Sequence, residues 1–385
     1  MSLMLSLKEL KEASSEDFAS FVRAIKILGP KNYAALSKFT GLPVETVRHR
    51  VKNLFVRRSV SIRIHVDRGK LGLARYWLML KFADDFNEDS SVSFLEHLAK
   101  YGYLEYYGRL IPRGGYAICL SLPARFEFNY RAMLDKLVDM NFIENYSMYR
   151  VNWIRYLSMR EDCYDFKRGV WSFNWNELPN VKSEDISIEE DTFLKPRIDE
   201  VDLWIVASLQ ANALASIQDI AETLKINYKK ILYHFKEHVI KNGIIKKYIL
   251  VWNGGVNGEK LTYMLVMVKD VDVEDLRLLE KTFSRIPFTF FDTYSNDARL
   301  YTAFMLMPIE HLQNCLNFIF KSLPKIRSRV FYELIDLNCS KVFAIPLELF
   351  IDGQWRFNVS HILRRVYELV KTPIKSEDVP THLVR

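Results

Sequence analysis

One motif occurs twice at a fixed distance in this chain of 385 residues, and no other feature constrains the fold more. Residues 36–51 read LSKFTGLPVETVRHRV and residues 220–235 read IAETLKINYKKILYHF. Both have the spacing of two short helices joined by a tight turn. Their matched positions lie 184 residues apart, and the same offset relates WSFN at 171–174 to WRFN at 355–358. The sequence therefore predicts a helix-turn-helix in duplicate, with two DNA-reading heads on one polypeptide.

Length and composition favour a folded protein of two to four domains, because 49% of the residues are apolar and 14% are aromatic. No apolar run has the length of a membrane span and no signal-like segment opens the chain, so we expect a cytoplasmic protein. The four cysteines (Cys119, Cys163, Cys315 and Cys339) are scattered without a CxxC pair. We read them as buried thiols in a reducing compartment, and predict neither a zinc site nor a disulfide framework.

The net charge of +7 is carried by the first half of the chain. Residues 1–180 hold 27 Lys and Arg against 20 Asp and Glu, whereas residues 181–385 hold 27 of each. The densest basic stretch runs from Arg48 to Arg75. Such a local field attracts polyanions, although many soluble proteins carry a similar charge on a solvated surface.

Apolar periodicity predicts three helices over residues 15–54, followed by a strand with basic residues on one face at 60–66, which we interpret as a wing. Strand, helix, strand, strand, helix and strand patterns then follow at 75–83, 91–100, 103–108, 115–122, 127–140 and 142–151. This βαββαβ order is that of a ferredoxin-like sandwich. Residues 198–336 repeat the whole series.

We therefore predict an α+β protein in which two tandem units, each a winged helix-turn-helix plus a ferredoxin-like domain, form an intrachain pseudo-dimer. The expected boundaries are 15–68 and 72–176 for the first unit, 177–197 for a polar, mobile acidic linker, 198–252 and 258–358 for the second unit, and 359–385 for a C-terminal helix and tail. Trp171 and Trp355 are each expected to pack on their own sandwich.

Three segments carry a family resemblance. Residues 198–221 (IDEVDLWIVASLQANALASIQDIA) resemble the opening of the Lrp/AsnC family of feast/famine regulators, and residues 41–54 (GLPVETVRHRVKNL) resemble its recognition helix. Residues 242–248 (NGIIKKY) and 70–73 (KLGL) resemble the connection to its ligand-binding RAM domain. The resemblance implies a cytoplasmic, archaeal-type or bacterial transcription regulator that binds double-stranded DNA, with further homodimerisation an open alternative.

A recognition helix presents its N-terminal half to base edges, while flanking cations contact phosphates. The predicted DNA-binding residues of the first unit are Thr46, Arg48, His49, Arg50, Lys52, Arg57, Arg58 and Arg63. Those of the second unit are Tyr228, Lys229, Lys230, His234, Lys236 and Lys241. The two sets differ, so we expect an asymmetric DNA site. The second unit has little excess charge, and loss of its DNA contact is an open alternative.

Members of the family often bind an amino-acid effector in a loop where a glycine is followed closely by an acid. The corresponding positions here are Gly108, Arg109, Arg113 and Asp292, and neither copy keeps that pattern cleanly. A small-molecule effector is therefore left open. We predict no enzyme activity, no catalytic residue, no cofactor and no metal site, since no Gly-rich phosphate loop, catalytic triad or metal-ligand spacing is evident.

Two other functions remain open. Siroheme decarboxylases are similar to Lrp/AsnC proteins, sometimes with two units fused, and act on a carboxylate-rich tetrapyrrole. Arg109, Arg113 and Tyr116 suit an anionic substrate, but the Cys-Tyr-x-Arg and Trp-Pro-Tyr motifs of those enzymes are absent. The third alternative is a non-catalytic assembly factor in which the paired sandwiches form an interaction platform.

Overall fold

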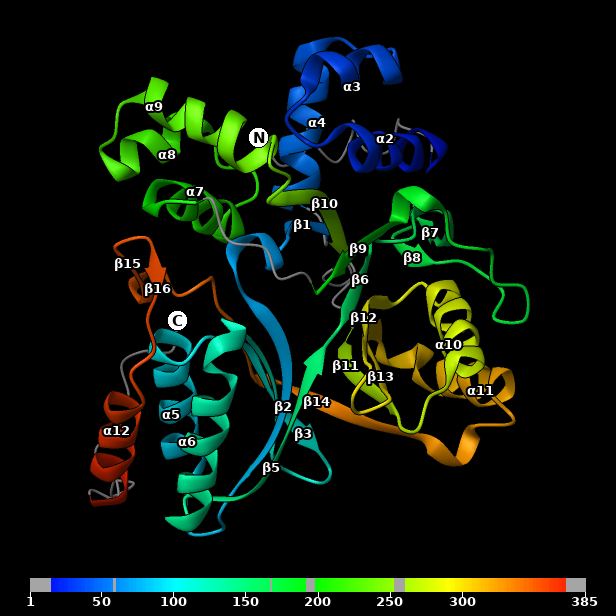
Figure 1. Ribbon diagram of the computed structural model, residues 1–385. Helices are drawn as coiled ribbons and strands as arrows, with labels where there is room; N and C mark the ends of the chain where they lie inside the picture. The colour runs from blue at the N-terminus through cyan, green and yellow to red at the C-terminus, as the bar shows by residue number, and fades with distance from the viewer. Residues whose placement is uncertain (1–14, 58–59, 167, 192–197, 253–259, 372–385) are drawn as a thin grey trace, which may run out of the picture.

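The computed structural model describes residues 15–57, 60–166, 168–191, 198–252 and 260–371. Two helical heads lie side by side at one end of the molecule, and two half-sheets with outer helices form the body (Figure 1). The mixed helix and sheet content agrees with the predicted α+β class. Among the described residues, no helix combines the length and apolarity needed to cross a bilayer.

Head one, as we name residues 15–57, contains α2 (Ser15–Leu28), α3 (Tyr33–Thr40) and α4 (Val44–Arg57). Head two, residues 200–240, contains α7 (Glu200–Ala211), α8 (Ile217–Leu224), α9 (Tyr228–Tyr233) and a π-helical turn, η5 (His234–Ile240). Both heads turn between their second and third helices through a residue with positive φ, Gly41 at +70° in head one and Lys225 at +54° in head two. Glycine adopts that conformation without steric cost, which explains its place in head one.

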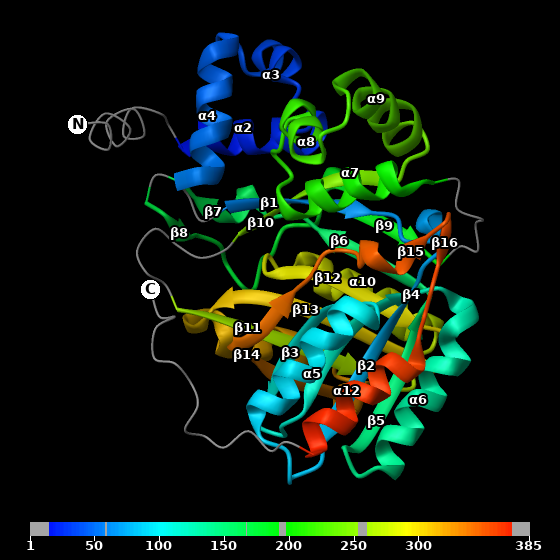
Figure 2. The same cartoon turned by 90° about the vertical axis from the view of Figure 1, so that its left-hand side faces the viewer.

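The strands that follow the heads pair with each other. β1 (Val60–Val66) runs antiparallel to β10 (Ile245–Trp252), with Ile62 opposite Leu250. The strand predicted at 60–66 is therefore present, but it is half of a two-stranded ribbon beneath both heads rather than a separate wing (Figure 2). This ribbon, β1/β10, lies between the heads and the body.

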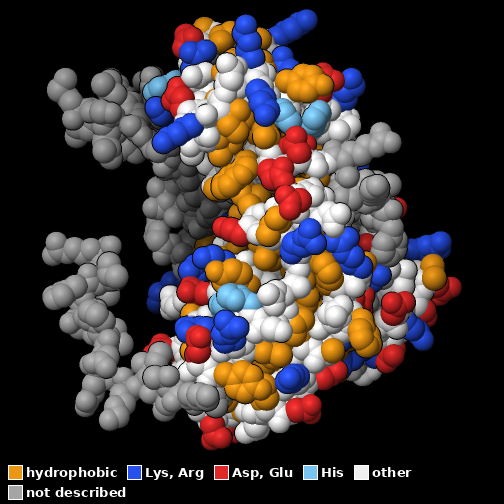
Figure 3. All heavy atoms as spheres, turned by 60° about the vertical axis from the view of Figure 1, so that its left-hand side comes forward, with side chains coloured by type: hydrophobic (Ala, Val, Ile, Leu, Met, Phe, Trp, Pro, Cys, Tyr) orange, Lys and Arg blue, Asp and Glu red, His pale blue; other side chains and the backbone are white. Residues whose placement is uncertain are grey.

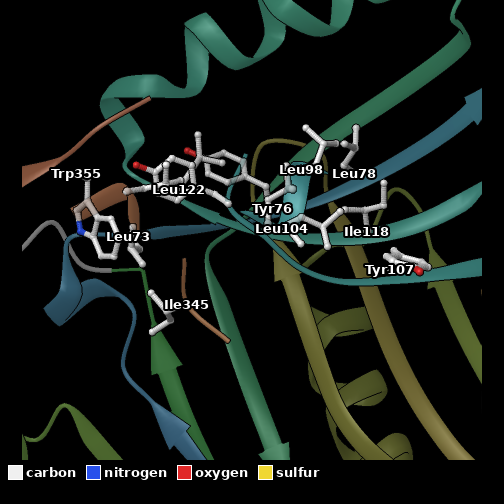
Figure 4. Close-up of a cluster of buried hydrophobic side chains, with 14 of the residues drawn as sticks. Leu73, Tyr76, Leu78, Leu98, Leu104, Tyr107, Ile118, Leu122, Ile345 and Trp355 are labelled. Carbon is white, nitrogen blue, oxygen red and sulfur yellow. The ribbon is translucent and has the colours of Figure 1, made fainter. Parts of the chain in front are cut away.

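The first half-sheet is built from β2 (Ala74–Phe82), α5 (Glu88–Tyr101), β3 (Leu104–Ile111), β4 (Tyr116–Leu122), α6 (Glu127–Asp139) and β5 (Ile143–Val151), in the order β5-β2-β4-β3. Alternating residues of these strands face α5 and α6. Leu78, Leu98 and Ile118 belong to the resulting hydrophobic core (Figure 4). Burial of this surface is the main force that holds helices and sheet together.

The second half-sheet has the same layout. Its elements are β11 (Leu261–Val268), α10 (Val273–Arg285), β12 (Thr289–Ser295), β13 (Leu300–Pro308), α11 (Leu312–Ser322) and β14 (Val330–Val342), in the order β14-β11-β13-β12. Cores of Leu279, Phe283 and Met305 fill the space under α10 and α11. The strand positions expected from alternation agree with the structure, except that β14 continues well beyond residue 336.

The half-sheets join at two places, where β14 pairs with β3 and where β6, the strand after β5, pairs with β12. β14 pairs with β11 through residues 330–335 and with β3 through residues 334–336 and, after a register shift, 340–342. β5 ends at Val151, and β6 (Trp153–Leu157) then pairs with β12. Asn152, at the break, is the position 184 residues before Asp336. A second core that includes Trp77, Leu265 and Phe304 lies between the two half-sheets.

The segments after each last strand also cross over. Trp171 packs against Phe288 of the second half, with ring centroids 4.8 Å apart. Trp355 packs against Tyr103 of the first half at 5.8 Å and donates its indole N–H to the Leu71 carbonyl at 2.7 Å. Figure 4 shows Trp355 close to Leu73 of the first half. The prediction that each tryptophan packs on its own sandwich is therefore wrong. The last helix, α12 (Val359–Lys371), lies beside α5 and α6 in the same exchanged manner (Figure 1).

The predicted acidic linker is partly ordered. Residues 186–190 form β9 (Ile186–Glu190), which pairs with β6 at the edge of the ten-stranded sheet. Glu189 is buried, with 4% of its surface exposed. Residues 192–197 of the predicted linker lie outside the described residues.

Candidate functional site

A cavity of about 530 Å³ lies between the β1/β10 ribbon and the two half-sheets. This volume is typical of small-molecule and cofactor sites. Matched positions of both halves contribute to the lining: His65 with Ile249, and Tyr106 with Phe290. The cavity therefore lies where the two halves meet.

The two walls of this cavity differ in polarity. The first half supplies its charged residues, which are Arg63, Arg68, Arg75 and Glu105, together with His65. The second half supplies mainly apolar and aromatic side chains, which are Ile249, Val251, Tyr263, Phe290, Phe291, Phe304 and Leu306. A flat ligand with anionic substituents matches such a lining, because its rings stack on the aromatic wall while its charges meet the cations.

Buried ion pairs hold two of the arginines in place. Arg68 donates two hydrogen bonds to the Glu105 carboxylate, at 3.1 and 3.0 Å, and Arg75 donates to Glu189 at 2.9 Å. Arg75 also lies 3.7 Å from Glu105. Burial opposes the charged state of Glu189, but Arg75, His65 and Arg68 together hold its pKa well below the usual range. Glu189 therefore keeps its negative charge at neutral pH and stays paired with Arg75.

His65 lies at the centre of the charged wall and is 1% exposed. Its Nδ1 is 2.7 Å from the Ser187 hydroxyl and its Nε2 is 3.0 Å from the Glu189 carboxylate. Burial lowers the pKa of His65 to about 4, despite the opposing effect of Glu189. At neutral pH the imidazole is therefore uncharged, and it is held by two polar partners.

Tyr156 marks the boundary between the two walls. Its ring centroid lies 4.4 Å from that of His65 and 5.6 Å from that of Phe291, and the Arg75 guanidinium lies 5.8 Å from the ring. Burial raises its pKa, so the phenol keeps its proton at neutral pH. Among the described residues, no hydrogen-bond partner contacts the hydroxyl. Tyr156 is therefore placed to give a proton to a ligand.

Arg63 was predicted to contact DNA phosphates, but the structure places it on β1, where it lines the cavity. It is exposed, and none of the described carboxylates forms an ion pair with it. Unlike Arg68 and Arg75, Arg63 is thus available for an anionic group of a ligand.

The remaining predicted residues of head one are on α4. Arg48, His49 and Lys52 are exposed, whereas Thr46 and Arg50 are half-buried. Arg48 forms an exposed ion pair with Glu45 at 3.3 Å. The Arg57 side chain and the whole of Arg58 lie outside the described residues.

In head two, Tyr228, Lys229 and Lys230 are exposed at the start of α9, and Lys236 and Lys241 are exposed further along. His234 differs from the prediction. It is 7% exposed, and its Nδ1 lies 2.9 Å from the carboxylate of Asp202 on α7, so it faces the interior of the head. Figure 3 shows Lys and Arg at the helical end of the molecule mixed with Asp and Glu, not a continuous basic face on that side.

The four predicted effector residues do not form one site. Arg109 pairs with Glu88 and Asp336, and Arg113 pairs with Glu333 at 2.8 Å. Asp292 is fully buried and accepts hydrogen bonds from Arg155 and Tyr301. Gly108 is paired with Ser340 in the sheet. All three charged side chains are thus engaged in holding the half-sheets together.

Sequence reasoning missed most of the cavity. His65, Arg68 and Arg75 fall in the basic stretch 48–75, which was predicted to attract nucleic acid. The sequence showed that these residues are present, but it did not show that their side chains face the interior. Glu189 fell in the predicted linker. Tyr156 had no local signal, because only the pairing of β6 with β12 brings it to the cavity.

Comparison with solved structures gives two matches that span nearly the whole chain. Siroheme decarboxylase NirDL superimposes with a TM-score of 0.53 at 12% identity, covering 91% of this chain and 99% of that one. The same enzyme in co-complex with an iron-uroporphyrin III analogue gives 0.51 at 11% identity, covering 93% and 100%. The chain shares the fold of siroheme decarboxylase NirDL.

An AsnC family transcriptional regulator from Agrobacterium tumefaciens matches only in part, covering 35% of this chain with a TM-score of 0.27, and no inference rests on it. No protein-family model matches the chain, and no curated protein matches its sequence. The prediction of no enzyme activity is contradicted by these matches, because a solved structure that covers 91% of this chain is that of an enzyme.

Proposed function

We propose that this protein is an enzyme that binds a carboxylate-bearing iron tetrapyrrole in the cavity and removes carbon dioxide from it, as a siroheme decarboxylase does. The observation that carries the proposal is the cavity itself, with one cationic and one aromatic wall, in a fold whose full-length structural match is to that enzyme. The macrocycle stacks on Phe290, Phe291 and Phe304, and Arg63 binds a peripheral carboxylate.

Decarboxylation breaks a carbon–carbon bond, releases carbon dioxide and leaves the electron pair on a side-chain carbon, which takes up one proton. Tyr156 is the group best placed to deliver that proton, since it lies where the charged and aromatic walls meet and stays protonated at neutral pH. His65 and Arg75 hold its surroundings rigid. A carboxylate turned toward the aromatic wall loses its hydration, which favours release of the charge as neutral carbon dioxide.

The test uses the full-length protein with iron-uroporphyrin III and with siroheme, in the absence of oxygen. Binding is followed by the absorbance of the tetrapyrrole, and the product by the mass loss of carbon dioxide. Tyr156→Phe should lower kcat by roughly 10²–10⁴-fold while the dissociation constant stays nearly unchanged, because it removes only the proton. Absence of tetrapyrrole binding by the wild-type protein would refute the proposal.

A second proposed function is binding of double-stranded DNA through head one, favoured by the exposed Arg48, His49 and Lys52 on α4. If about six to ten phosphates are neutralised, affinity should fall roughly 10³–10⁵-fold between 50 and 200 mM salt. Arg48→Ala should weaken binding to every sequence. Footprinting on genomic fragments tests this reading, and a binding constant that does not respond to salt would contradict it.

A further inference from the structure

Two histidines and two aspartates converge in head two, and none of the four is among the residues that line the cavity. Asp199 and Asp202 come from the start of α7, and His234 and His238 come from η5. One ligand atom from each of these four residues can be chosen so that all lie within 4.8 Å of one another. Motif spacing did not predict this cluster, because 32 residues separate Asp202 from His234.

We propose that these four side chains bind a divalent transition-metal cation, with Zn²⁺ the best fit. The Nδ1 atom of His234 is 2.9 Å from Asp202 Oδ1 and 3.6 Å from Asp199 Oδ1, and the Nδ1 atom of His238 is 3.2 Å from Asp202 Oδ1. Ligands bound to tetrahedral zinc at about 2.0–2.1 Å lie roughly 3.3–3.4 Å apart. These three separations bracket that value and all four ligand atoms lie within 4.8 Å of one another, so side-chain rotations are needed to complete the site.

The carboxylates are already oriented by the backbone. Asp199 accepts a hydrogen bond from the Asp202 amide and Asp202 accepts one from the Asp199 amide, each at 3.0 Å, forming a capping box. Secondary hydrogen bonds of this kind fix the ligand atoms of metal sites. The two histidines lie on a π-helical turn, an uncommon conformation that occurs often at functional sites, with ring centroids 4.6 Å apart.

One side of the cluster is buried and the other side is open to solvent. The side chains of Asp202 and His234 are 1% and 9% exposed, whereas those of His238 and Asp199 are 32% and 47% exposed. A cation can therefore enter past His238 and Asp199. Once bound, it takes the place of the contacts between the two imidazole Nδ1 atoms and Asp202, and its charge offsets that of the buried carboxylate.

The fold of a head does not require this cluster. In head one, the positions that match Asp202 and His234 are Phe18 and Arg50, whose guanidinium lies 6.0 Å from the Phe18 ring. The same helix layout thus forms around an aromatic contact. Four protein ligands leave no open position on a tetrahedral ion, so the role of the metal is structural: it fastens η5 to α7.

The experiment titrates the metal-free, full-length protein with Zn²⁺ alone, by calorimetry, and with Co²⁺ as a coloured probe of tetrahedral coordination. We expect one equivalent to bind, Co²⁺ to show tetrahedral absorption bands, and Zn²⁺ to raise the Tm. His238→Gln should weaken binding by at least about 100-fold, because it removes a direct ligand whereas loss of a supporting group alone costs 10–100-fold. Asp202→Asn, which retains the shape of the capping box, should do the same.

The control is His361→Gln, which alters another histidine pair, His97 and His361, with stacked rings 5.1 Å apart. It should leave the affinity for Zn²⁺ unchanged. The proposal is overturned if the wild-type protein binds Zn²⁺ no better than His238→Gln does, or if His361→Gln weakens binding equally. Neither outcome depends on whether the cavity takes a tetrapyrrole.

Discussion

The two halves of the molecule differ in the polarity of their side chains at matched positions. At the cavity the first half carries the polar residue, whereas in the heads the second half does. In the ribbon, the first half has His65 where the second has Ile249. In the heads, the first half has Phe18 where the second has Asp202. Because one backbone layout accommodates either residue, these polar groups are not demanded by the fold. They mark the places where each half has its own chemistry.

The largest expected difference in the free energy of unfolding is between substitutions of Lys26 and of its matched residue, Gln210. Lys26 is fully buried and donates to Glu161 and Asp185, whereas Gln210 accepts one hydrogen bond from the Ile345 amide at 3.3 Å. Lys26→Met should lower the free energy of unfolding by about 3–5 kcal/mol, because it removes the buried cation that Asp185 and Glu161 share and leaves Glu161 with only Arg23 and Lys182. Denaturant unfolding measures this loss.

Gln210→Met is the matched control and should cost less than about 1 kcal/mol, since it removes a single long hydrogen bond. Equal losses in the two variants would show that the buried ion cluster in the first half contributes no more than its uncharged counterpart.

His65 should make the free energy of unfolding depend on pH, an effect that the matched residue Ile249 cannot produce because it does not titrate. The folded pKa of His65 is about 4, below the unfolded value of about 6.5. Between these values the unfolded chain binds the extra proton, so the free energy of unfolding falls as the pH drops through this window, by about 3 kcal/mol. His65→Gln should flatten the curve, and His49→Gln, at an exposed position on α4, should not. An unchanged acid slope in His65→Gln would contradict the assignment of this effect to the cavity.

Ligand affinity should distinguish Arg63 from its matched residue, Lys247. Arg63 lines the cavity, while Lys247 donates to the Ile186 carbonyl at 3.2 Å. Arg63→Ala should weaken binding of iron-uroporphyrin III by roughly 10–100-fold, the value of one charge-assisted hydrogen bond. Lys247→Ala should leave the affinity near that of the wild type. Tetrapyrrole absorbance titrations compare the two, and equal effects would mean that only overall charge matters.

The smallest expected difference lies in the helix caps. Ser216 and Asp219 form a reciprocal capping box at the start of α8, with both hydrogen bonds at 3.0 Å. The matched Asn32 caps α3 with one hydrogen bond, to the Ala35 amide at 3.2 Å. Ser216→Ala should cost about 1 kcal/mol and Asn32→Ala about half of that. Thermal unfolding of the two variants tests the order, and a larger cost at Asn32 would reverse this comparison.

Local periodicity was enough to predict the helices of head one and the βαββαβ order, because burial on one face of an element repeats at short intervals. It did not predict the pairing of β6 with β12 or of β14 with β3, since both join strands that are far apart in the sequence and neither pairing has a periodic signature. His234 shows the same limit: helical spacing allowed an outward position, but Asp202 on a distant helix holds it inward. Most of the candidate site depends on such long-range pairings.

The exchanged tryptophans have a consequence for how the chain becomes a working protein. Trp355 and α12 complete the hydrophobic interior of the first half, and Trp171 does so for the second. Each half produced alone would therefore expose an apolar surface that the other half buries in the full-length chain. A gene split between the halves should yield soluble material only when both fragments are made together in one cell.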